Sequence, residues 1–453
     1  MPNIRRILIC LMIIFCFAAG YAARTTLSGL SLVSSPSQNN LGAQVASSNL
    51  DGTGVDLRPA ETLVQILHNL NGQYVEQIKP ADQGRMTYDM LKAMLGSLND
   101  PNSRFVSLKE KLVIDDSLNG KFHGIGAITS IKSISFGGVK EEHLIIDTVL
   151  PGGASEQAGL FSGDDIVEID GKSVLPYDPY SRANKMVSSY KDDGTITNRN
   201  AIKKKLETEQ SRIDKGMPIV EAESILSTAD NKELELGILR FGIKKIIKVK
   251  PKEFTLNPIE TSIPSVGIGL LRINYFGNKT PEAVTEAINS FKDKNIKSVI
   301  LDLRRVFGGD MDSLVKTAGV FEAGKPIGIL QKSRNRKSTI NASAQSAANW
   351  DGKLVVLVDK GTARLPELFA SSLAINNKAI IIGQATAGDP VDVSLFQLQD
   401  GSAVSLRTGK YLTSDGIDLT GKGIKVDYKI AALSGIDNYL EQAVKVLNIK
   451  AAK

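Results

Sequence analysis

The sequence predicts a multidomain protein of α+β and α/β class with three parts: a helical N-terminal region, a β-rich domain that carries an insert, and an α/β core. The core is predicted from residues 353–390, where an apolar run typical of a buried parallel strand precedes a glycine turn, a helical pattern and a second buried strand. Short apolar segments separated by glycine turns predict the β-rich domain. Apolar residues at helical spacing predict helices between residues 57 and 95.

The core pattern also indicates where a functional site would lie. Strand, turn, helix and strand in this order form a βαβ unit, and function tends to sit at the carboxyl ends of its strands. The first strand ends before a turn at Gly361, and helical spacing begins near Leu365. The turn from Gly361 to Glu367 is therefore where a nucleophile would be expected.

Length and composition set limits on the class of protein. With 453 residues, 42% of them hydrophobic and 23% charged, the chain can form two or three globular domains. The net charge is +6, but lysine and arginine are scattered along the chain, which favours solubility over nucleic-acid binding.

The N-terminus has the pattern of a secretory signal peptide over residues 1–23. Arg5 and Arg6 precede an apolar run over residues 7–19 that ends in small residues, which predicts export to a bacterial periplasm or cell envelope. An uncleaved membrane anchor is the alternative. Both cysteines, Cys10 and Cys16, lie in this run, so a cleaved chain would hold no thiol nucleophile and no cysteine metal site.

The remaining chain divides by composition and pattern. We predict the following parts: a flexible Ser- and Gly-rich linker at 24–55, the helical N-terminal region at 56–115, the β-rich domain at 116–255 with an insert at about 175–216, and the core at 256–453. The insert is polar and rich in charge, and its second half predicts an exposed helix. We interpret it as a solvated excursion, with a partner-contact arm as the alternative.

The β-rich domain contains three phrases in a familiar order. They are residues 121–127 (KFHGIGA), 151–160 (PGGASEQAGL) and 163–171 (GDDIVEIDG). Together they resemble a PDZ domain of the circularly permuted bacterial type. The resemblance implies that a loop of four residues offers backbone N–H groups to a peptide's terminal carboxylate: Gly124, Ile125, Gly126 and Ala127. The alternative is a PDZ-like fold whose groove is occluded.

The core and its flanking phrases resemble the C-terminal processing, or tail-specific, serine proteases, whose core has a ClpP/crotonase-like fold. The phrases that carry the resemblance, in order along the chain, are residues 98–106 (LNDPNSRFV), 266–276 (VGIGLLRINYF), 411–416 (YLTSDG) and 421–427 (GKGIKVD). The resemblance covers roughly residues 57–448. It implies a serine nucleophile with a lysine base, and unfolded protein tails or C-terminal peptides as partners.

The positions that carry the family's chemistry differ in this chain. The resemblance places Arg364 at the nucleophile position, Asp389 at the lysine position and Val393 where a glutamine is often found. Gly308 and Gly309 remain where the family supplies oxyanion-hole amides, but Arg305-Val306-Phe307 replaces Gly-Asn-Pro before them. Bulk at these positions could fill the acyl pocket.

Arginine cannot perform the missing step. A serine–lysine pair needs a hydroxyl that attacks and a neutral amine that takes its proton, whereas a guanidinium is always protonated and has no acceptor lone pair. We expect Thr362 to point away from the turn, and Ser371 and Ser372 to lie too far along the helix. The three histidines lie outside the core, and no cluster has metal-ligand or cofactor-binding spacing.

Two functions therefore remain open. One is a non-catalytic, exported pseudoprotease that binds peptide C-termini, with a protein partner or a homo-oligomer as further possibilities; the other is a serine endopeptidase with weak activity or relocated catalytic residues. If the frame is kept, Arg364 and Asp389 face each other, so we predict an ion pair between them. Removing one partner would cost about 3–5 kcal/mol if the pair were buried.

Overall fold

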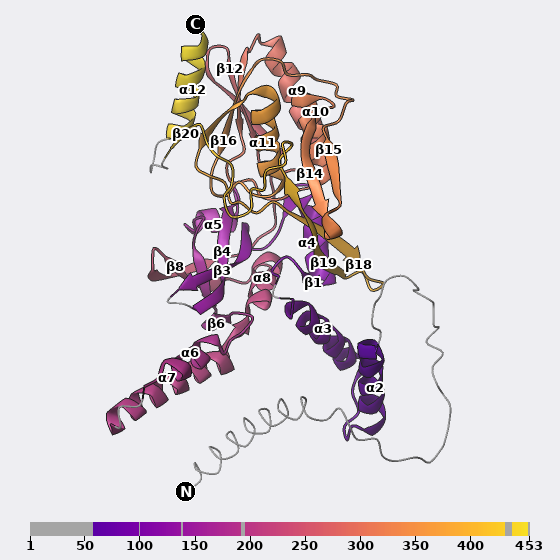
Figure 1. The fold of residues 1–453 in the computed structure, drawn as a ribbon, viewed down its shortest axis with the longest axis vertical. Helices are drawn as coiled ribbons and strands as arrows, with labels where there is room; N and C mark the ends of the chain where they lie inside the picture. The colour runs from indigo at the N-terminus through magenta and orange to yellow at the C-terminus, as the bar shows by residue number, and fades with distance from the viewer. Residues whose placement is uncertain (1–57, 99, 137–138, 192–194, 431–436, 452–453) are drawn as a thin grey trace, which may run out of the picture. The chain divides into compact units, whose positions relative to one another are not determined.

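The computed structural model describes residues 58–98, 100–136, 139–191, 195–430 and 437–451 (Figure 1). The predicted signal peptide, both cysteines and the predicted linker lie outside these residues. The chain divides into two compact units, Met1–Ile78 and Lys79–Lys453. In the first, the described residues form the predicted helix α2 (Arg58–Gln73). Among the described residues, no helix has the length and apolar character needed to span a bilayer.

The second unit contains the predicted α/β core. Its six-stranded sheet has the order β11–β12–β13–β16–β17–β20, with β11 antiparallel to β12 and all later neighbours parallel. The central strands are almost continuously apolar and buried, as expected for parallel strands covered on both faces. The bounds are β11 Ile259–Ser265, β12 Ile268–Ile273, β13 Ser298–Asp302, β16 Lys353–Val358, β17 Ile380–Gly383 and β20 Tyr428–Lys429.

Helices cover both faces of this sheet because alternate residues of a strand point to opposite sides. Val356 and Val358 pack in one core cluster with α9, α10 and α11, whereas Val355 and Leu357 pack in another with α12. Figure 1 shows the three helices and α12 on opposite sides of the sheet. Their bounds are α9 Thr280–Asp293, α10 Met311–Glu322, α11 Leu365–Asn377 and α12 Asn438–Ala451.

A second, antiparallel sheet of the core was not predicted. Its order is β1–β19–β14–β15, with β18 also paired to β19. The sequence analysis assigned residues 56–115 to a helical region and did not predict β1, which pairs with β19 about 300 residues later. The bounds are β1 Arg104–Val106, β14 Pro326–Lys332, β15 Lys337–Asn341, β18 Val391–Gln397 and β19 Ala403–Leu412, with a 3₁₀ turn at Ser333–Asn335 and helices α3 Pro80–Gly96 and α4 Leu108–Ser117 beside β1.

The β-rich domain is a seven-stranded sheet with β3 at one edge. The helix α8 lies over it and buries Ile219, Ala222 and Leu226 in its core. The bounds are β3 Ala127–Phe136, β4 Val139–Val149, β5 Asp165–Ile169, β6 Lys172–Leu175, β7 Met217–Pro218, β8 Leu234–Arg240 and β9 Ile243–Val249, with α5 Ala154–Gln157 and α8 Ile219–Thr228, and the pair β2 Lys121–Phe122 and β10 Phe254–Thr255 where the chain enters and leaves.

The three phrases that resemble a PDZ domain come together in this one sheet. The Leu150 N–H donates to the Gly126 carbonyl at 3.0 Å, and the Ser155 N–H donates to the Ile125 carbonyl at 2.7 Å. A separation of these segments into different domains would have contradicted the PDZ prediction, and it is not found. The insert lies between β6 and β7, where it forms α6 (Ser181–Ser189) and α7 (Ile196–Lys215).

A buried carboxyl between α10 and α11 makes core stability depend on pH. Glu322 is 1% exposed, accepts a hydrogen bond from Asn376 at 2.7 Å and another from the Ser372 hydroxyl, and burial raises its pKa to about 7. Because the folded pKa lies above that of the unfolded chain, its stabilising contribution is complete below about pH 4.5 and is lost as the pH rises toward 7. The loss is about 3 kcal/mol.

We therefore expect Glu322→Gln to flatten the pH dependence of stability. Urea unfolding at pH 5 and pH 8 should show a smaller difference for Glu322→Gln than for the parent chain, whereas the exposed control Glu286→Gln should match the parent. An equal difference in stability between pH 5 and pH 8 for the parent and for Glu322→Gln would contradict the role of Glu322 in this pH dependence.

Candidate active site

The turn after β16 is joined to the loop after β13 by backbone hydrogen bonds. The Ala363 N–H donates to the Val306 carbonyl at 3.1 Å, and the Gly308 N–H donates to the Ala363 carbonyl at 3.2 Å. Phe307 and Ala363 form a parallel bridge between them. The two loops that the family resemblance assigned to the nucleophile and the oxyanion hole are thus one connected structure at the carboxyl edge of the sheet.

Arg364 occupies a sharp, strained turn at the start of α11. Its backbone angles are φ 64° and ψ −121°. A positive φ is rare for residues other than glycine, and this region costs about 1–3 kcal/mol unless the surrounding structure imposes it. The backbone therefore retains an exposed-elbow geometry at the position where the family carries its nucleophile, although the side chain cannot use it for attack.

The carboxylate of Glu367 imposes this geometry. It is fully buried and accepts hydrogen bonds from the N–H groups of Arg364 at 3.1 Å, Gly388 at 2.7 Å and Asp389 at 3.0 Å, and from the Thr386 hydroxyl. Burial raises the pKa of Glu367, while the four donors oppose that rise. One side chain thus fixes both the nucleophile position and the lysine position.

The predicted ion pair is confirmed. The Arg364 Nε lies 3.4 Å from the Asp389 Oδ2, and the side chains are 23% and 38% exposed. The pair is therefore not fully buried, so the cost of 3–5 kcal/mol that we gave for a buried pair does not apply. A partly exposed ion pair of this kind contributes about 1 kcal/mol or less.

The Arg364 guanidinium has two further partners. It donates from Nη2 to the Asn102 Oδ1 at 2.6 Å, and its Cζ lies 4.6 Å from the centre of the Phe307 ring, where a cation–π interaction is favourable. By the family resemblance, Phe307, Arg364 and Asp389 are all departures from the family's pattern, and the Arg364 guanidinium contacts both of the others. The departures from the family form one cluster rather than three independent changes.

The remaining hydroxyl groups of the turn and helix are committed elsewhere. Thr362 is fully buried and donates to the Leu303 carbonyl at 2.8 Å. Ser371 donates to the Leu368 carbonyl at 2.8 Å, and Ser372 donates to Phe369 and Glu322. Each therefore points away from the Arg364 turn, as predicted for Thr362.

One of the two predicted oxyanion-type amides is also used within the frame. The Gly308 N–H is occupied by the Ala363 carbonyl, as described above. Gly309 has φ 111°, and a Cβ on it would lie 2.6 Å from the Phe276 Cβ, so packing alone requires a glycine there. The two glycines thus allow the backbone to follow this path. Of their two N–H groups, that of Gly308 is already occupied and is not free for a substrate.

The predicted peptide-binding loop lies at the C-terminal end of α8. The Ile125 N–H donates to the Leu226 carbonyl at 3.0 Å, so this amide is already occupied. Gly124 and Gly126 have φ near 74° and 73°, and a Cβ on Gly124 would lie 2.1 Å from the Leu226 carbonyl oxygen. Outside the pairing of β3 with β4, the N–H groups of Gly124, Gly126 and Ala127 donate to no backbone carbonyl of the described residues.

A charged cluster that the sequence analysis missed links α8 to β1 and α4. The Arg104 Nη1 donates to the Glu110 Oε1 at 2.9 Å, and its Nε lies 3.6 Å from the Glu223 Oε2. Burial raises the pKa of Glu223. The spacing of Ser107 and Glu110, which form a capping box at the start of α4, was the one sequence signal available for this cluster.

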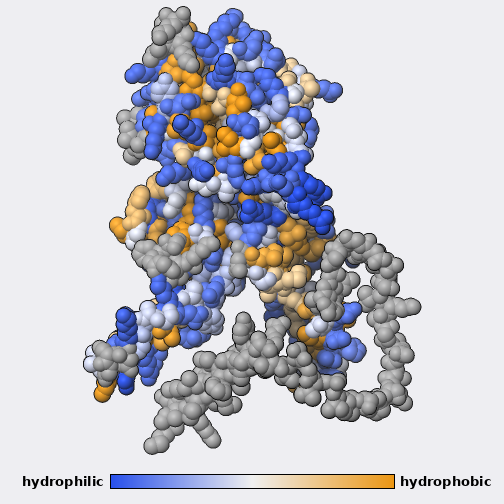
Figure 2. Space-filling model, in the orientation of Figure 1, coloured by the Kyte–Doolittle hydropathy of each residue, from blue (hydrophilic) through white to orange (hydrophobic). Residues whose placement is uncertain are grey.

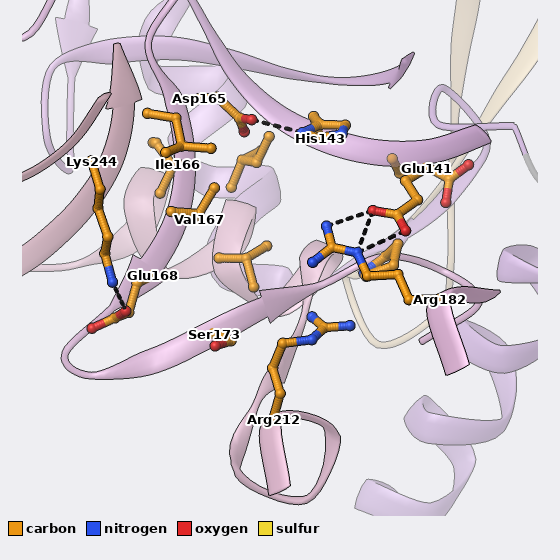
Figure 3. A pocket seen from close by; sticks show the side chains of 15 residues that line it. Glu141, His143, Asp165, Ile166, Val167, Glu168, Ser173, Arg182, Arg212 and Lys244 are labelled. Carbon is orange, nitrogen blue, oxygen red and sulfur yellow. Dashed lines mark hydrogen bonds and ion pairs between the residues drawn. The ribbon is translucent and has the colours of Figure 1, made fainter. Parts of the chain in front are cut away.

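A hollow of about 230 Å³ lies on the β-rich domain, between its sheet and the base of the insert (Figure 3). Arg182 of α6 donates to Glu141 through Nε at 2.7 Å, His143 Nδ1 lies 2.6 Å from Asp165, and Lys244 Nζ lies 2.6 Å from Glu168. The hydrogen bond to Asp165 raises the pKa of His143. The Arg182–Glu141 pair attaches the insert to the sheet, whereas the other two pairs join strands within the sheet. None of the core's candidate residues lines the hollow.

The described ranges contain no cluster of candidate metal ligands. No group of three or more histidine, cysteine, aspartate or glutamate residues there has a geometry that could hold a metal ion.

Comparisons with known proteins agree with this architecture. Residues 267–430 match the model of Peptidase family S41. The chain is 26% identical over 367 residues to the "Carboxy-terminal processing protease CtpA" of Bacillus subtilis, an alignment that covers 80% of this chain and 68% of that protein. It is also 26% identical over 364 residues to a "Probable CtpA-like serine protease" of Staphylococcus aureus, with 80% of this chain and 62% of that protein covered.

Among solved structures, a "photosystem II D1 C-terminal processing protease" superimposes with a TM-score of 0.56 at 21% sequence identity. The superposition covers 81% of this chain and 86% of that one, which shows a shared fold. The four phrases of the sequence, the βαβ core with its strained elbow, and these matches lead to one assignment. The core, residues 267–430, matches peptidase family S41, and most of the chain is similar to C-terminal processing proteases.

Proposed function

We propose that this protein is an exported, non-catalytic member of its family that binds the C-termini of other proteins. The observation that carries the proposal is the contact of Phe307, Arg364 and Asp389, the positions at which the chain departs from the family. Export rests on the N-terminal pattern of basic residues followed by an apolar run. The chain spans 62–68% of the length of the curated relatives described above.

The chemical argument concerns the nucleophile. The elbow presents a guanidinium that is always protonated, and this guanidinium is held against an aromatic ring and a carboxylate. Asp389 could accept a proton, but its carboxylate faces Arg364 rather than a hydroxyl. Loss of a serine nucleophile removes several orders of magnitude of rate, and what remains comes from binding and oxyanion contacts.

The side chains at the site do not support the alternative, a serine endopeptidase with relocated catalytic residues. Thr362, Ser371 and Ser372 are buried and donate to main-chain carbonyls. His123 and His143 bond to Asp116 and Asp165 in the β-rich part of the chain, away from the elbow. At the carboxyl edge of the core sheet the Thr362 and Thr386 hydroxyls contact the carboxylates of Asp359 and Glu367, but both threonines are buried, so neither hydroxyl is open to a substrate.

Peptide binding would use the edge of β3. This strand pairs only with β4 among the described residues, so its other edge can accept an extended peptide as an added strand, with α8 beside it. The N–H groups of Gly126 and Ala127 would receive the terminal carboxylate. Such a groove requires neither a nucleophile nor a base, so it can persist where catalysis is lost.

Restoring the two catalytic side chains should restore little hydrolysis. We expect Arg364→Ser with Asp389→Lys to cleave an unfolded protein with an apolar C-terminus only slightly faster than the parent chain, because Phe307 still lies against position 364. Val306, in contrast, packs in the core. Adding Phe307→Pro tests this reason directly. The products are identified by mass spectrometry. Robust hydrolysis by the double variant would show that the pocket can still support catalysis.

Binding should depend on a free carboxylate. Titration of the full chain with an apolar C-terminal peptide should give measurable affinity, and the same peptide with an amidated end should bind at least tenfold more weakly, which corresponds to about 1.4 kcal/mol. Gly126→Ala should weaken binding, since its Cβ would lie 2.7 Å from the Gly153 Cα, whereas Gly152→Ala, with a similar φ and open surroundings, is the matched control. Equal affinity for both peptides, or none for either, would argue against carboxylate capture.

A further inference from the structure

The β8–β9 hairpin ends in an unusual turn. Among the described residues β9 pairs only with β8, and the two strands are joined by Phe241 and Gly242 with φ 53° and 77°. A two-residue turn with positive φ at both positions strongly prefers asparagine followed by glycine. Phenylalanine at the first position is therefore conformationally less favourable than asparagine would be.

Nothing within the described chain compensates for this cost. The Phe241 side chain is 98% exposed, so it buries almost no surface in the folded protein. A large apolar residue in a strained turn and in open water is unfavourable on both counts. This combination points to a contact outside the chain that covers the ring.

Two neighbours extend the apolar tip. Ile243 is 63% exposed and Phe161 is 59% exposed. Arg240 holds Phe161 in place: its Cζ lies 4.4 Å from the ring centre, while its guanidinium donates to Asp164 at 2.7 Å and to the Gly159 carbonyl at 2.8 Å. The tip therefore has three large exposed apolar side chains, Phe241 and Ile243 at the turn and Phe161 against Arg240 just before it. Figure 2 shows hydrophobic residues on the side of the molecule where Figure 1 labels β8.

The hairpin behind the tip is basic. Residues 234–252 contain six cations, Arg240, Lys244, Lys245, Lys248, Lys250 and Lys252, and a single acid, Glu235. The acids that face these cations from other elements are Asp164, Glu168 and Glu233, and they pair with Arg240, Lys244 and Lys248. For Lys245, Lys250 and Lys252, no carboxylate of the described residues is placed at ion-pair distance. Lysines on an edge strand commonly prevent edge pairing, but that role does not explain the exposed Phe241.

We propose that this tip, Phe161, Phe241 and Ile243, enters the interface of an anionic lipid bilayer, with Lys245 of β9 and Lys250 just after it near the headgroups. The exposed apolar side chains lie near Lys245 and Lys250, which have no carboxylate at ion-pair distance among the described residues, so the surface is complementary to one that is both apolar and anionic. Apolar side chains that penetrate the interface together with lysines near anionic headgroups form a recognised mode of peripheral membrane binding. The inference is independent of the proposed function.

A local probe at the tip tests the proposal in the full chain. The chain has one tryptophan, Trp350, which is 5% exposed and supplies a constant background. Phe241→Trp reports the environment of the tip even if the N-terminal apolar segment also binds lipid. The matched control is Phe396→Trp on β18, since Phe396 is also exposed, at 49%.

The Phe241→Trp emission should shift to the blue and be quenched by bromine-labelled lipid on vesicles of phosphatidylcholine with phosphatidylglycerol, and much less on phosphatidylcholine alone. Lys245→Glu with Lys250→Glu should raise the lipid concentration for half-maximal quenching by about tenfold. The Phe396→Trp emission should not change. The proposal fails if Phe241→Trp is not quenched by anionic vesicles, if both probes respond alike, or if the shift appears without lipid and grows with protein concentration, which would indicate a protein interface.

Discussion

The buried carboxylate of Glu367 is the constraint on which the candidate site depends. It accepts hydrogen bonds from the backbone of Arg364, Gly388 and Asp389, so it joins the turn after β16 to the loop after β17. The Glu367 side chain is fully buried, where a carboxylate without these donors would be costly. The strained elbow at Arg364 therefore persists because the backbone around Glu367 requires it, and this requirement does not depend on which side chain the elbow carries.

The backbone of this turn does not depend on the side chain at position 364. The fold is therefore compatible with Phe307, Arg364 and Asp389 at the positions to which the family resemblance assigned catalytic roles. The cation of Arg364 would be unfavourable alone in a partly covered cleft, but Asp389 supplies an opposite charge, Asn102 an acceptor and Phe307 an aromatic face. Asn102 comes from the segment just before β1, which pairs with β19. The cluster thus ties the N-terminal part of the second unit to the start of α11.

Local patterns in the sequence predicted the elements that local physics determines. The buried strands β16 and β17, the helix between them and the position of the insert follow from apolar periodicity and glycine turns. The ion pair of Arg364 with Asp389 followed from the family's motifs. Long-range pairing could not be predicted this way: three residues at Arg104–Val106 give no sign that their partner strand is β19, and nothing local indicates that the Ile125 amide bonds to Leu226. The strained Phe241 was missed because its exposure becomes visible only in three dimensions.

The most direct measurement of the central claim is product analysis of the unmodified protein. The purified chain is incubated with an unfolded protein that carries an apolar C-terminus, and fragments are identified by mass spectrometry alongside an Arg364→Ala variant. The account predicts that neither protein generates fragments above the rate of the substrate alone. Cleavage by the unmodified chain that disappears in the Arg364→Ala variant would contradict it.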